Sequence, residues 1–284
     1  MIKIIFSGTY VTPSVILNYF GIQCIRYVLA KTIRTFRSVY INFEQSEKSK
    51  ILKKYGYLVI TDFLNQSEYE KVLVELNNAK NLGKLEPIID GSTFVERSTF
   101  NSENSDDIPN IFNSICKSKV LSQVIESVEL RRFQVGDVWL DTIKHGDVDG
   151  AKDSQKEVHT DNFYDTHKIW YFPDEVTSAN GPLMFAPKSH RFSIRRIFFE
   201  YLMSVRYKSK EHLAWRVSPL ARRAMCPNFI SITVPANSLV IANTHGFHRR
   251  GDASANATRR QIHIRFRSEP FSDILSKDGI IVDQ

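Results

Sequence analysis

Apolar side chains recur every three or four residues over much of the first half of the chain. A Ser-x-x-Glu capping box at Ser67 begins one such segment, which continues to Leu76 and predicts a helix. Pro109 begins a second segment, whose apolar stripe runs through residues 111–128. The polar run at residues 98–110 between them is typical of a loop. The first half is therefore predicted to be mainly helical.

The period of the pattern changes to two at residue 131. In the last alternating run, Ile262 and Ile264 fall on one face, while Gln261 and His263 fall on the other. Turns rather than crossover helices separate these runs, which favours an antiparallel sandwich or barrel within a single domain of residues 1–284. The predicted strands lie in "RRFQVGDVWLDTI", "HKIWYFP", "NFISITVP", "SLVIAN" and "RRQIHIRFR".

Two basic segments depart from the β pattern. Residues 1–50 are predicted to be a basic, amphipathic helical extension that packs on the body of the protein. The alternative is peripheral contact of residues 11–37 with an anionic membrane surface. Residues 188–223 contain ten Lys or Arg against two Glu, and are predicted to be a basic helical insertion between strands. Most of its charges are expected to lie on a solvated helix face.

Composition narrows the class of protein and of partner. A hydrophobic fraction of 42% and a charged fraction of 24% are those of a globular protein with a sizeable core. Three widely separated cysteines make neither a disulfide framework nor a zinc motif, which indicates a reducing, cytoplasmic setting. The net charge of +7 favours a small anionic partner. The basic residues belong to no recognised nucleic-acid module, so no nucleic-acid partner is expected. Nothing in the sequence indicates the oligomeric state.

Two His-x-Asp pairs are candidates for metal binding. His145 and Asp147 lie in a stretch rich in glycine and charge, and are predicted to be solvent-exposed turn residues. His159 and Asp161 instead begin a strand-like segment, in which residues two apart point to the same face. The second pair is therefore the better candidate for two ligands of one ion inside a barrel.

A third ligand must come from elsewhere in the chain. The downstream stretch "NTHGFHRRG" offers His245 and His248. Two imidazoles and one carboxylate on one face of an octahedron suit non-haem Fe(II). Arg259 and Arg260 follow and supply guanidinium groups for a carboxylate. Strand parity groups Arg259 with the polar face of the last strand, which favours Arg259 for a ligand in the cavity.

Four motifs in order resemble the phytanoyl-CoA dioxygenase family of Fe(II)- and 2-oxoglutarate-dependent oxygenases. The resemblance extends from residue 53 to residue 267. It rests on the first strand "GYLVITDFL", the ligand pair "HTD", the turn and strand "NGPLMFAPKSH", and the distal "HRRG" with an arginine eleven positions after its histidine. Each motif is weak alone, whereas four in sequence are specific.

The resemblance implies a double-stranded β-helix (jelly-roll, cupin-like) core with a helical N-terminal layer. It also implies the site residues: His159, Asp161 and His248 as iron ligands, Arg259 for the side-chain carboxylate of 2-oxoglutarate, and Trp170 lining the cosubstrate pocket. The implied reaction uses Fe(II), 2-oxoglutarate and O₂ to hydroxylate a C–H bond of a small, anionic organic molecule, releasing succinate and CO₂. A carboxylate at Asp161 favours hydroxylation over halogenation.

One position departs from the family pattern. Family members often have a small hydroxyl residue two positions after the distal histidine, where this chain has Arg250. The arrangement around the cosubstrate carboxylate is therefore expected to differ in this chain. A jelly-roll barrel that binds a small anionic ligand or partner without turnover is the alternative function. His190 and His263 are expected to be structural.

Overall fold

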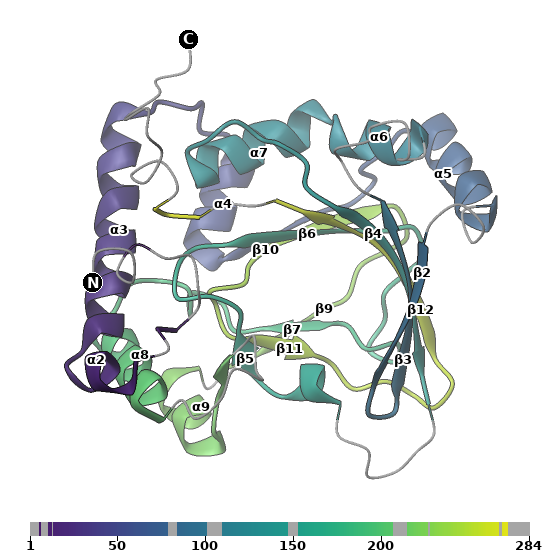
Figure 1. The fold of residues 1–284 in the computed structure, drawn as a ribbon. Coiled ribbons are helices and arrows are strands. Elements are labelled where there is room, and N and C mark those ends of the chain that lie inside the picture. The colour runs from purple at the N-terminus through teal and green to yellow at the C-terminus, as the bar shows by residue number, and fades with distance from the viewer. Residues whose placement is uncertain are drawn as a thin grey trace.

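Two antiparallel β-sheets face each other and form the centre of the molecule (Figure 1). The computed structural model describes residues 6, 11–12, 14–78, 84–100, 110–146, 153–206, 215–226, 228–266 and 269–271. The facing sheets form the expected jelly-roll core, so the prediction of a mainly β fold is confirmed.

The larger sheet has seven strands and the smaller has five. The order in the larger sheet is β1 (Tyr57–Ile60), β10 (Ser238–Asn243), β6 (His167–Phe172), β12 (Thr258–Arg265), β4 (Val138–His145), β3 (Thr93–Phe100) and β2 (Lys84–Asp90). The order in the smaller sheet is β8 (Trp215–Arg216), β5 (His159–Thr160), β11 (His248–Arg250), β7 (Leu183–Phe185) and β9 (Ile230–Ile232).

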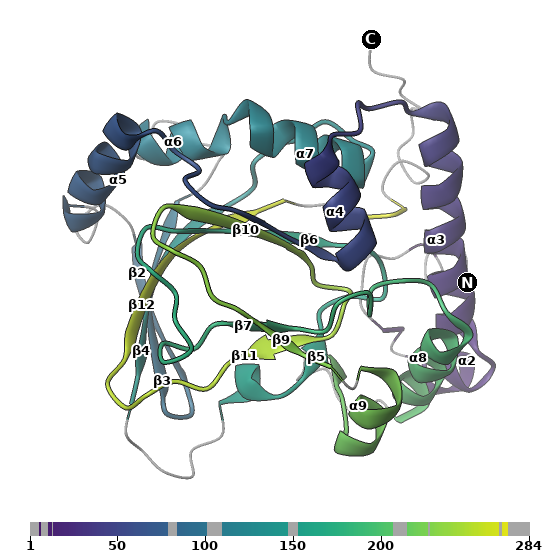
Figure 2. The same cartoon turned by 180° about the vertical axis from the view of Figure 1, so that it is seen from behind.

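A layer of helices covers the outer face of the larger sheet (Figures 1 and 2). The layer consists of α4 (Glu47–Tyr55), α5 (Gln66–Asn78), α6 (Asn110–Cys116) and α7 (Lys119–Glu129). Ile262 and Ile264 of β12 are fully buried in the cluster between sheet and helices, together with Leu121 and Ile125 of α7. The apolar side of β12 therefore faces the helices, and its polar side faces the space between the sheets, as its alternation predicts.

The capping box of α5 lies two residues before the predicted one. The Glu68 amide donates to Asn65 Oδ1 at 3.0 Å, and the Asn65 amide donates to Glu68 Oε2 at 3.3 Å. These two bonds satisfy exposed backbone donors reciprocally. The assignment of the box to Ser67 was wrong, because "NQSE" also has the required spacing, starting from asparagine.

The prediction of a mainly helical first half missed the β2–β3 hairpin. Ser98 to Phe100, expected in a loop, are the end of β3, while residues 101–109, Pro109 included, lie outside the described residues. The two-residue turn is Gly91-Ser92, between the paired Asp90 and Thr93, with a φ of +60° at the glycine. Gly-Ser between strand-like runs is a recognised hairpin signal, and it was overlooked.

A second group of helices lies at one side of the two sheets (Figure 2). It comprises α2 (Val15–Tyr19), α3 (Ile22–Tyr40), α8 (Ile194–Arg206) and α9 (Pro219–Met225). α8 packs against both α2 and α3. In the part of the chain that the structure describes, no helix has the length and apolar character needed to cross a membrane.

Candidate metal centre

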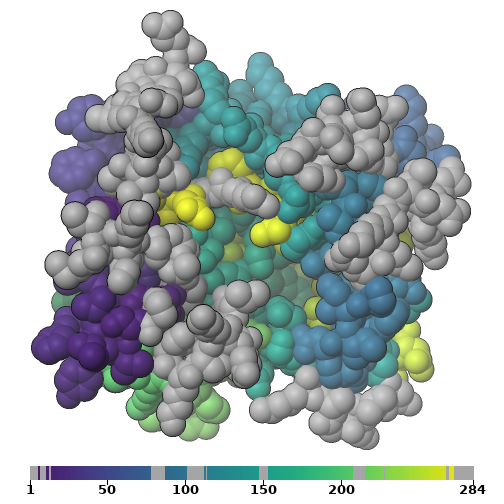
Figure 3. Space-filling model, in the orientation of Figure 1, coloured from purple at the N-terminus to yellow at the C-terminus, as the bar shows by residue number. Residues whose placement is uncertain are grey.

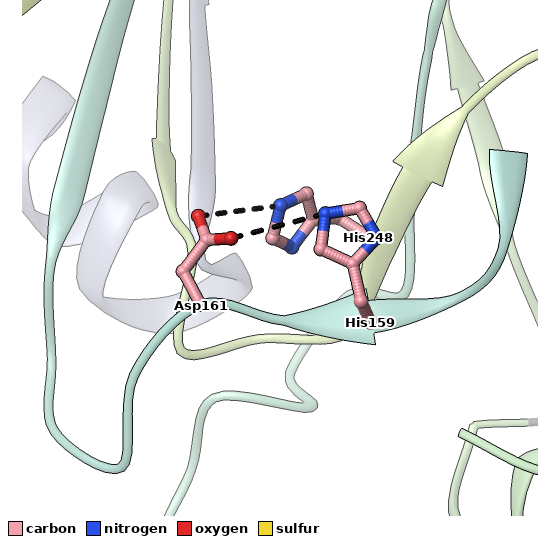
Figure 4. Close-up of side chains that lie close together, drawn as sticks. All are labelled: His159, Asp161 and His248. Carbon is pink, nitrogen blue, oxygen red and sulfur yellow. Dashed lines mark ion pairs between the residues drawn. The ribbon is translucent and has the colours of Figure 1, made fainter. Parts of the chain in front are cut away.

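His159, Asp161 and His248 converge in the space between the sheets (Figure 4). His248 Nε2 lies 3.5 Å from Asp161 Oδ2, and His159 Nε2 lies 3.8 Å from Asp161 Oδ1. One ligand atom from each residue fits within a mutual distance of 4.8 Å. Among the described residues, no other group of three or more His, Cys, Asp or Glu side chains converges in this way.

Backbone carbonyls fix the orientation of both imidazoles. His159 Nδ1 lies 2.7 Å from the carbonyl of Glu157, and His248 Nδ1 lies 3.0 Å from the carbonyl of Gly246. Because a carbonyl only accepts, each Nδ1 must carry the proton and donate it. Each Nε2 then has a free lone pair directed at the same point, which is how metal-binding histidines are usually held.

The protonation states of the three groups suit a cation. Burial, followed by the proximity of His248, lowers the pKa of His159 to about 3, so the ring is neutral at neutral pH. Burial alone would raise the pKa of Asp161. Lys168, whose ammonium lies 2.8 Å from the carboxylate, and the two histidines lower it below its ordinary value instead. The site therefore presents two neutral nitrogens and one anionic carboxylate.

The other histidine candidates lie elsewhere. His245 is fully buried, and its Nδ1 lies 2.8 Å from the carbonyl of Asn162 and 3.1 Å from the Arg196 guanidinium. It does not take part in the convergent group. His145 ends β4 and is 4% exposed, so the prediction of a solvated turn residue was wrong. Its partner in that motif, Asp147, lies outside the described residues.

A cavity of about 320 Å³ extends from the convergent group between the two sheets. His159 and His248 form part of its wall, and β6 contributes Lys168, Trp170 and Phe172, which alternate along one face of the strand. Sequence reasoning selected Trp170 and missed Lys168, although the same parity argument places Lys168 on the same face, two residues earlier.

Arg259 lies in the wall of this cavity as a buried cation. Its side chain is 8% exposed, and one terminal N–H donates to the carbonyl of Gly181. Its Nε has no hydrogen-bond partner among the described residues. Burial, and then the proximity of Arg250, lowers the pKa of Arg259 to about 9. A buried guanidinium with an unused donor would be satisfied by an anion.

Arg260, the alternative, points to the opposite side of β12. Its guanidinium forms two hydrogen bonds of 2.7 Å with the carboxylate of Asp174. Gln261 and His263 line the cavity with Arg259, as strand parity predicts. The two neighbouring arginines therefore lie on opposite sides of the strand, and only Arg259 faces the cavity.

The "NGPL" turn and the "HRRG" segment meet beside Arg259. The Gly251 amide donates to the carbonyl of Pro182 at 2.7 Å. A Cβ at Gly251 would lie 2.8 Å from that carbonyl oxygen, so this approach requires glycine. Gly181 adopts a φ of +71° in the turn and offers its carbonyl to Arg259. Two of the four sequence motifs thus build one end of the cavity.

Arg250, the departure from the family pattern, also lines the cavity. It lies two residues after His248, on the same face of β11. Its guanidinium lies 2.8 Å from Asp153 Oδ2, which also accepts from the Thr93 hydroxyl at 2.7 Å. A second, anchored guanidinium therefore lies where family members often have a small hydroxyl side chain.

Aromatic rings surround His263 in another part of the wall. Its imidazole stacks on Trp170 with ring centroids 5.4 Å apart, and it meets the edge of Trp139 at 5.1 Å. Its Nε2 has no partner among the described residues. His263, expected to be structural, is therefore a buried residue of the cavity wall whose Nε2 is left without a protein partner in the described part of the chain.

Comparison with known proteins identifies a sequence family and a shared fold. The sequence model of the phytanoyl-CoA dioxygenase (PhyH) family matches residues 52–201. A search of curated proteins found no match.

Similar solved structures include the following three. The epimerase SnoN, in complex with Fe³⁺, α-ketoglutarate and nogalamycin RO, has a TM-score of 0.58 and 11% identity over 82% of this chain and 90% of that chain.

The carbocyclase SnoK from nogalamycin biosynthesis has a TM-score of 0.53 and 13% identity over 78% of this chain and 83% of that chain. EctD from S. alaskensis with bound Fe has a TM-score of 0.53 and 13% identity over 80% of each chain. At these identities the solved structures establish the shared fold, while the family match concerns the sequence itself.

Proposed function

The chain belongs to the phytanoyl-CoA dioxygenase family, and on that premise we propose that His159, Asp161 and His248 bind its catalytic iron. The family is one of Fe(II)- and 2-oxoglutarate-dependent dioxygenases, and the chain is such an enzyme. The observation that carries the residue assignment is the convergence of two Nε2 atoms and one carboxylate within 4.8 Å.

The donor set fits ferrous iron. Two neutral imidazoles and one carboxylate leave further coordination positions for 2-oxoglutarate and O₂. When bound, the iron and its cosubstrate supply the oxidising chemistry, which consumes O₂ and yields succinate and CO₂. The residues of this chain hold the ligands in place, with the protons kept on the two Nδ1 atoms by Glu157 and Gly246. Asp161 fills the position that a halide ligand would need, which favours hydroxylation.

Arg259 is proposed to bind the side-chain carboxylate of 2-oxoglutarate. Its unused Nε donor and its burial beside Phe172 support this role, because an anion there would compensate a desolvated cation. Trp170 is proposed to form part of the wall along the cosubstrate. Arg250 adds a second positive charge at the same end, which supports binding of an anionic group rather than a neutral one.

The substrate is proposed to be a small organic anion. Five basic side chains line the cavity, namely Arg97, Lys168, Arg249, Arg250 and Arg259. The first four each pair with a carboxylate, and Arg259 has no such partner among the described residues. Lys168 is the basic side chain in contact with the metal-binding carboxylate. His263, between two tryptophans, offers a polar nitrogen on an aromatic surface. A carboxylate or phosphate on a partly apolar molecule matches this wall.

The reaction is tested with protein purified without oxygen. The protein is mixed with Fe(II) and 2-oxoglutarate, exposed to O₂, and assayed for succinate with and without small carboxylic acids, phosphate esters and coenzyme A thioesters. The proposal predicts O₂-dependent succinate formation that increases with the correct substrate and is absent in His159→Ala. Arg260→Gln, altered outside the cavity, should retain it. Turnover that survives in His159→Ala would reject the ligand assignment, and binding without turnover would favour a non-catalytic barrel.

The cellular setting is proposed to be cytoplasmic. Cys24, Cys116 and Cys226 are all unpaired. Burial raises the pKa of the Cys116 thiol to about 12, so it is not a reactive thiolate. Free, unreactive thiols support a reducing compartment.

A further inference from the structure

The longest helix of the second group, α3, buries polar side chains in its contact with the rest of the protein. Gln23 and Arg26 are fully buried, and Gln23 Nε2 lies 3.2 Å from Glu200 of α8. Lys31 lies 2.8 Å from Asp165 and forms a hydrogen bond with it. The inner face of α3 therefore combines these polar and charged contacts with apolar ones, because Tyr27 and Ala30 are buried in a cluster with Phe163 and Phe271.

The outer face of α3 is apolar. Ile25, Val28, Phe36 and Val39 are 49%, 37%, 61% and 72% exposed. Their spacing of three, eight and three residues keeps them on one side of a helix. Scattered exposed apolar residues are normal, but four on one side of a single helix, with exposed Thr32 and Thr35 between them, are typical of a surface that contacts something else.

The short helix α2 also buries a polar side chain and exposes apolar ones. Its polar Asn18 is 1% exposed and donates through Nδ2 to the carbonyl of Thr12 at 2.9 Å. Ile16 and Tyr19 of the same helix are 71% and 66% exposed, and Phe20, which follows it, is 79% exposed. Apolar exposure in α2 therefore continues that of α3.

α8 and α9 extend this surface. The Tyr201 hydroxyl donates to the carbonyl of Tyr19 at 3.2 Å, which joins α8 to α2. Ile194 and Phe198, one helical turn apart on α8, are 83% and 61% exposed, and Leu220 of α9 is 80% exposed. The four helices lie at one side of the molecule in both ribbon views, and in Figure 3 purple atoms lie along the left edge with green atoms below them.

The exposed charge on these helices is positive. The sequence has no Asp or Glu before Glu44. In the described parts of α8 and α9 the acidic residue is Glu200, which is fully buried and lies 3.0 Å from Arg196. Arg195 of α8 and Arg222 and Arg223 of α9 are exposed. Apolar side chains with exposed arginines and no exposed carboxylate match an anionic lipid surface.

We propose that the outer faces of α2, α3, α8 and α9 bind peripherally to a membrane that contains anionic lipids. The exposed apolar side chains enter the head-group region, and Arg195, Arg222 and Arg223 contact lipid phosphates. A symmetric dimer through this surface would bring like-charged arginines together, which disfavours a second copy as the occupant. The inference concerns a surface distinct from the metal centre and does not depend on the reaction proposed above.

Vesicle flotation with the full chain tests the proposal. Two vesicle compositions are compared, phosphatidylcholine alone and phosphatidylcholine with phosphatidylglycerol. The chain is expected to float with the anionic vesicles, to a smaller extent with the neutral ones, and less at high salt. Arg222→Gln with Arg223→Gln should lower the anionic partition coefficient on the order of tenfold.

A matched pair of double variants at exposed apolar residues distinguishes binding by this surface from nonspecific hydrophobic binding. Val28→Ser with Phe36→Ser alters the outer face of α3 and should strongly reduce flotation. Val74→Ser with Ile89→Ser alters residues that are 61% and 76% exposed on α5 and β2, and should leave flotation unchanged. Thermal unfolding of each variant, with an unchanged midpoint, shows that the fold is intact.

Two results would overturn the proposal. One is the absence of flotation with anionic vesicles. The other is a combination of two observations. Light scattering would show a dimer of the wild-type chain that is lost in the double variant Val28→Ser with Phe36→Ser, and flotation of the wild-type chain would be the same with neutral and anionic vesicles. In that case a second copy, rather than a membrane, covers the surface.

Discussion

His248 lies directly opposite His159 across the β5–β11 pair, with the two ring centroids 4.3 Å apart. This register joins two segments that are far apart in the sequence, and Asp161 follows two residues after His159. The Nδ1–H of each imidazole donates to a backbone carbonyl two residues earlier in the chain. One short strand pairing therefore fixes the position of both nitrogen ligands.

Arg259 and Arg260 should differ sharply in their effect on cosubstrate binding. Arg259→Gln removes a buried cation with an unused donor, and is expected to weaken 2-oxoglutarate binding by about 30- to 100-fold, as for a lost charge-assisted hydrogen bond. Arg260→Gln breaks a contact with Asp174 outside the cavity and should change binding little. Calorimetry with Mn²⁺-loaded protein measures both. Equal losses in the two variants would contradict the assignment.

Arg250 is expected to support the same anion. Arg250→Ser restores the small hydroxyl residue of the family pattern but removes one of the two positive charges at this end of the cavity. Weaker 2-oxoglutarate binding, by about tenfold, should follow. Arg250→Lys keeps a positive charge near Asp153 and should lose less. Unchanged affinity in Arg250→Ser would show that Arg250 serves only to pair with Asp153. The dissociation constant is measured as for Arg259.

His190 should make stability depend on pH. Burial lowers the pKa of His190 to about 4 from 6.5, so the unfolded chain binds a proton in that interval before the folded chain does. Stability therefore falls as the pH falls from 6.5 to 4, by an amount on the order of 3 kcal/mol for this residue at most. His190→Gln can still donate to the carbonyl of Lys53. Its unfolding free energy, measured by urea unfolding at several pH values, should therefore change less with pH than that of the wild type. The same pH dependence of the unfolding free energy in the variant and the wild type would reject this role.

The cap of α5 offers a paired test of the fold. Asn65→Ala removes the side-chain acceptor of the Glu68 amide and should cost about 1 kcal/mol of unfolding free energy. Ser67→Ala, at the position that the sequence pattern suggested, should change it by less than about 0.5 kcal/mol. Denaturant midpoints at equal slope give both values. A larger cost at Ser67 would restore the sequence-based assignment.

The sequence predicted most of what depends on local periodicity. Parity along β12 correctly separated Arg259 from Arg260, because one face of that strand is buried against helices and the other faces a cavity. The hairpin at Gly91 was missed although its turn signal is local. The burial of His145 was not predictable from its glycine-rich surroundings, because it results from packing beside the "NGPL" turn, far along the chain.

The orientation of α3 could not be predicted from the sequence for a related reason. An amphipathic pattern defines two faces of a helix but does not say which one points inward. Here Gln23 and Lys31 point inward beside the buried Tyr27, because Glu200 and Asp165, more than a hundred residues away, provide partners for them. Lys168 was missed because no motif includes it, although its parity with Trp170 was available.

Metal binding tests the central claim most directly. Under anaerobic conditions, titration of the metal-free chain with Fe(II) in a calorimeter should give one site per chain. Asp161→Ala and His248→Ala should each weaken that site by at least about 100-fold, whereas His245→Gln, at the neighbouring histidine outside the group, should retain it. Retention of the site in His248→Ala, with its loss in His245→Gln, would contradict the account.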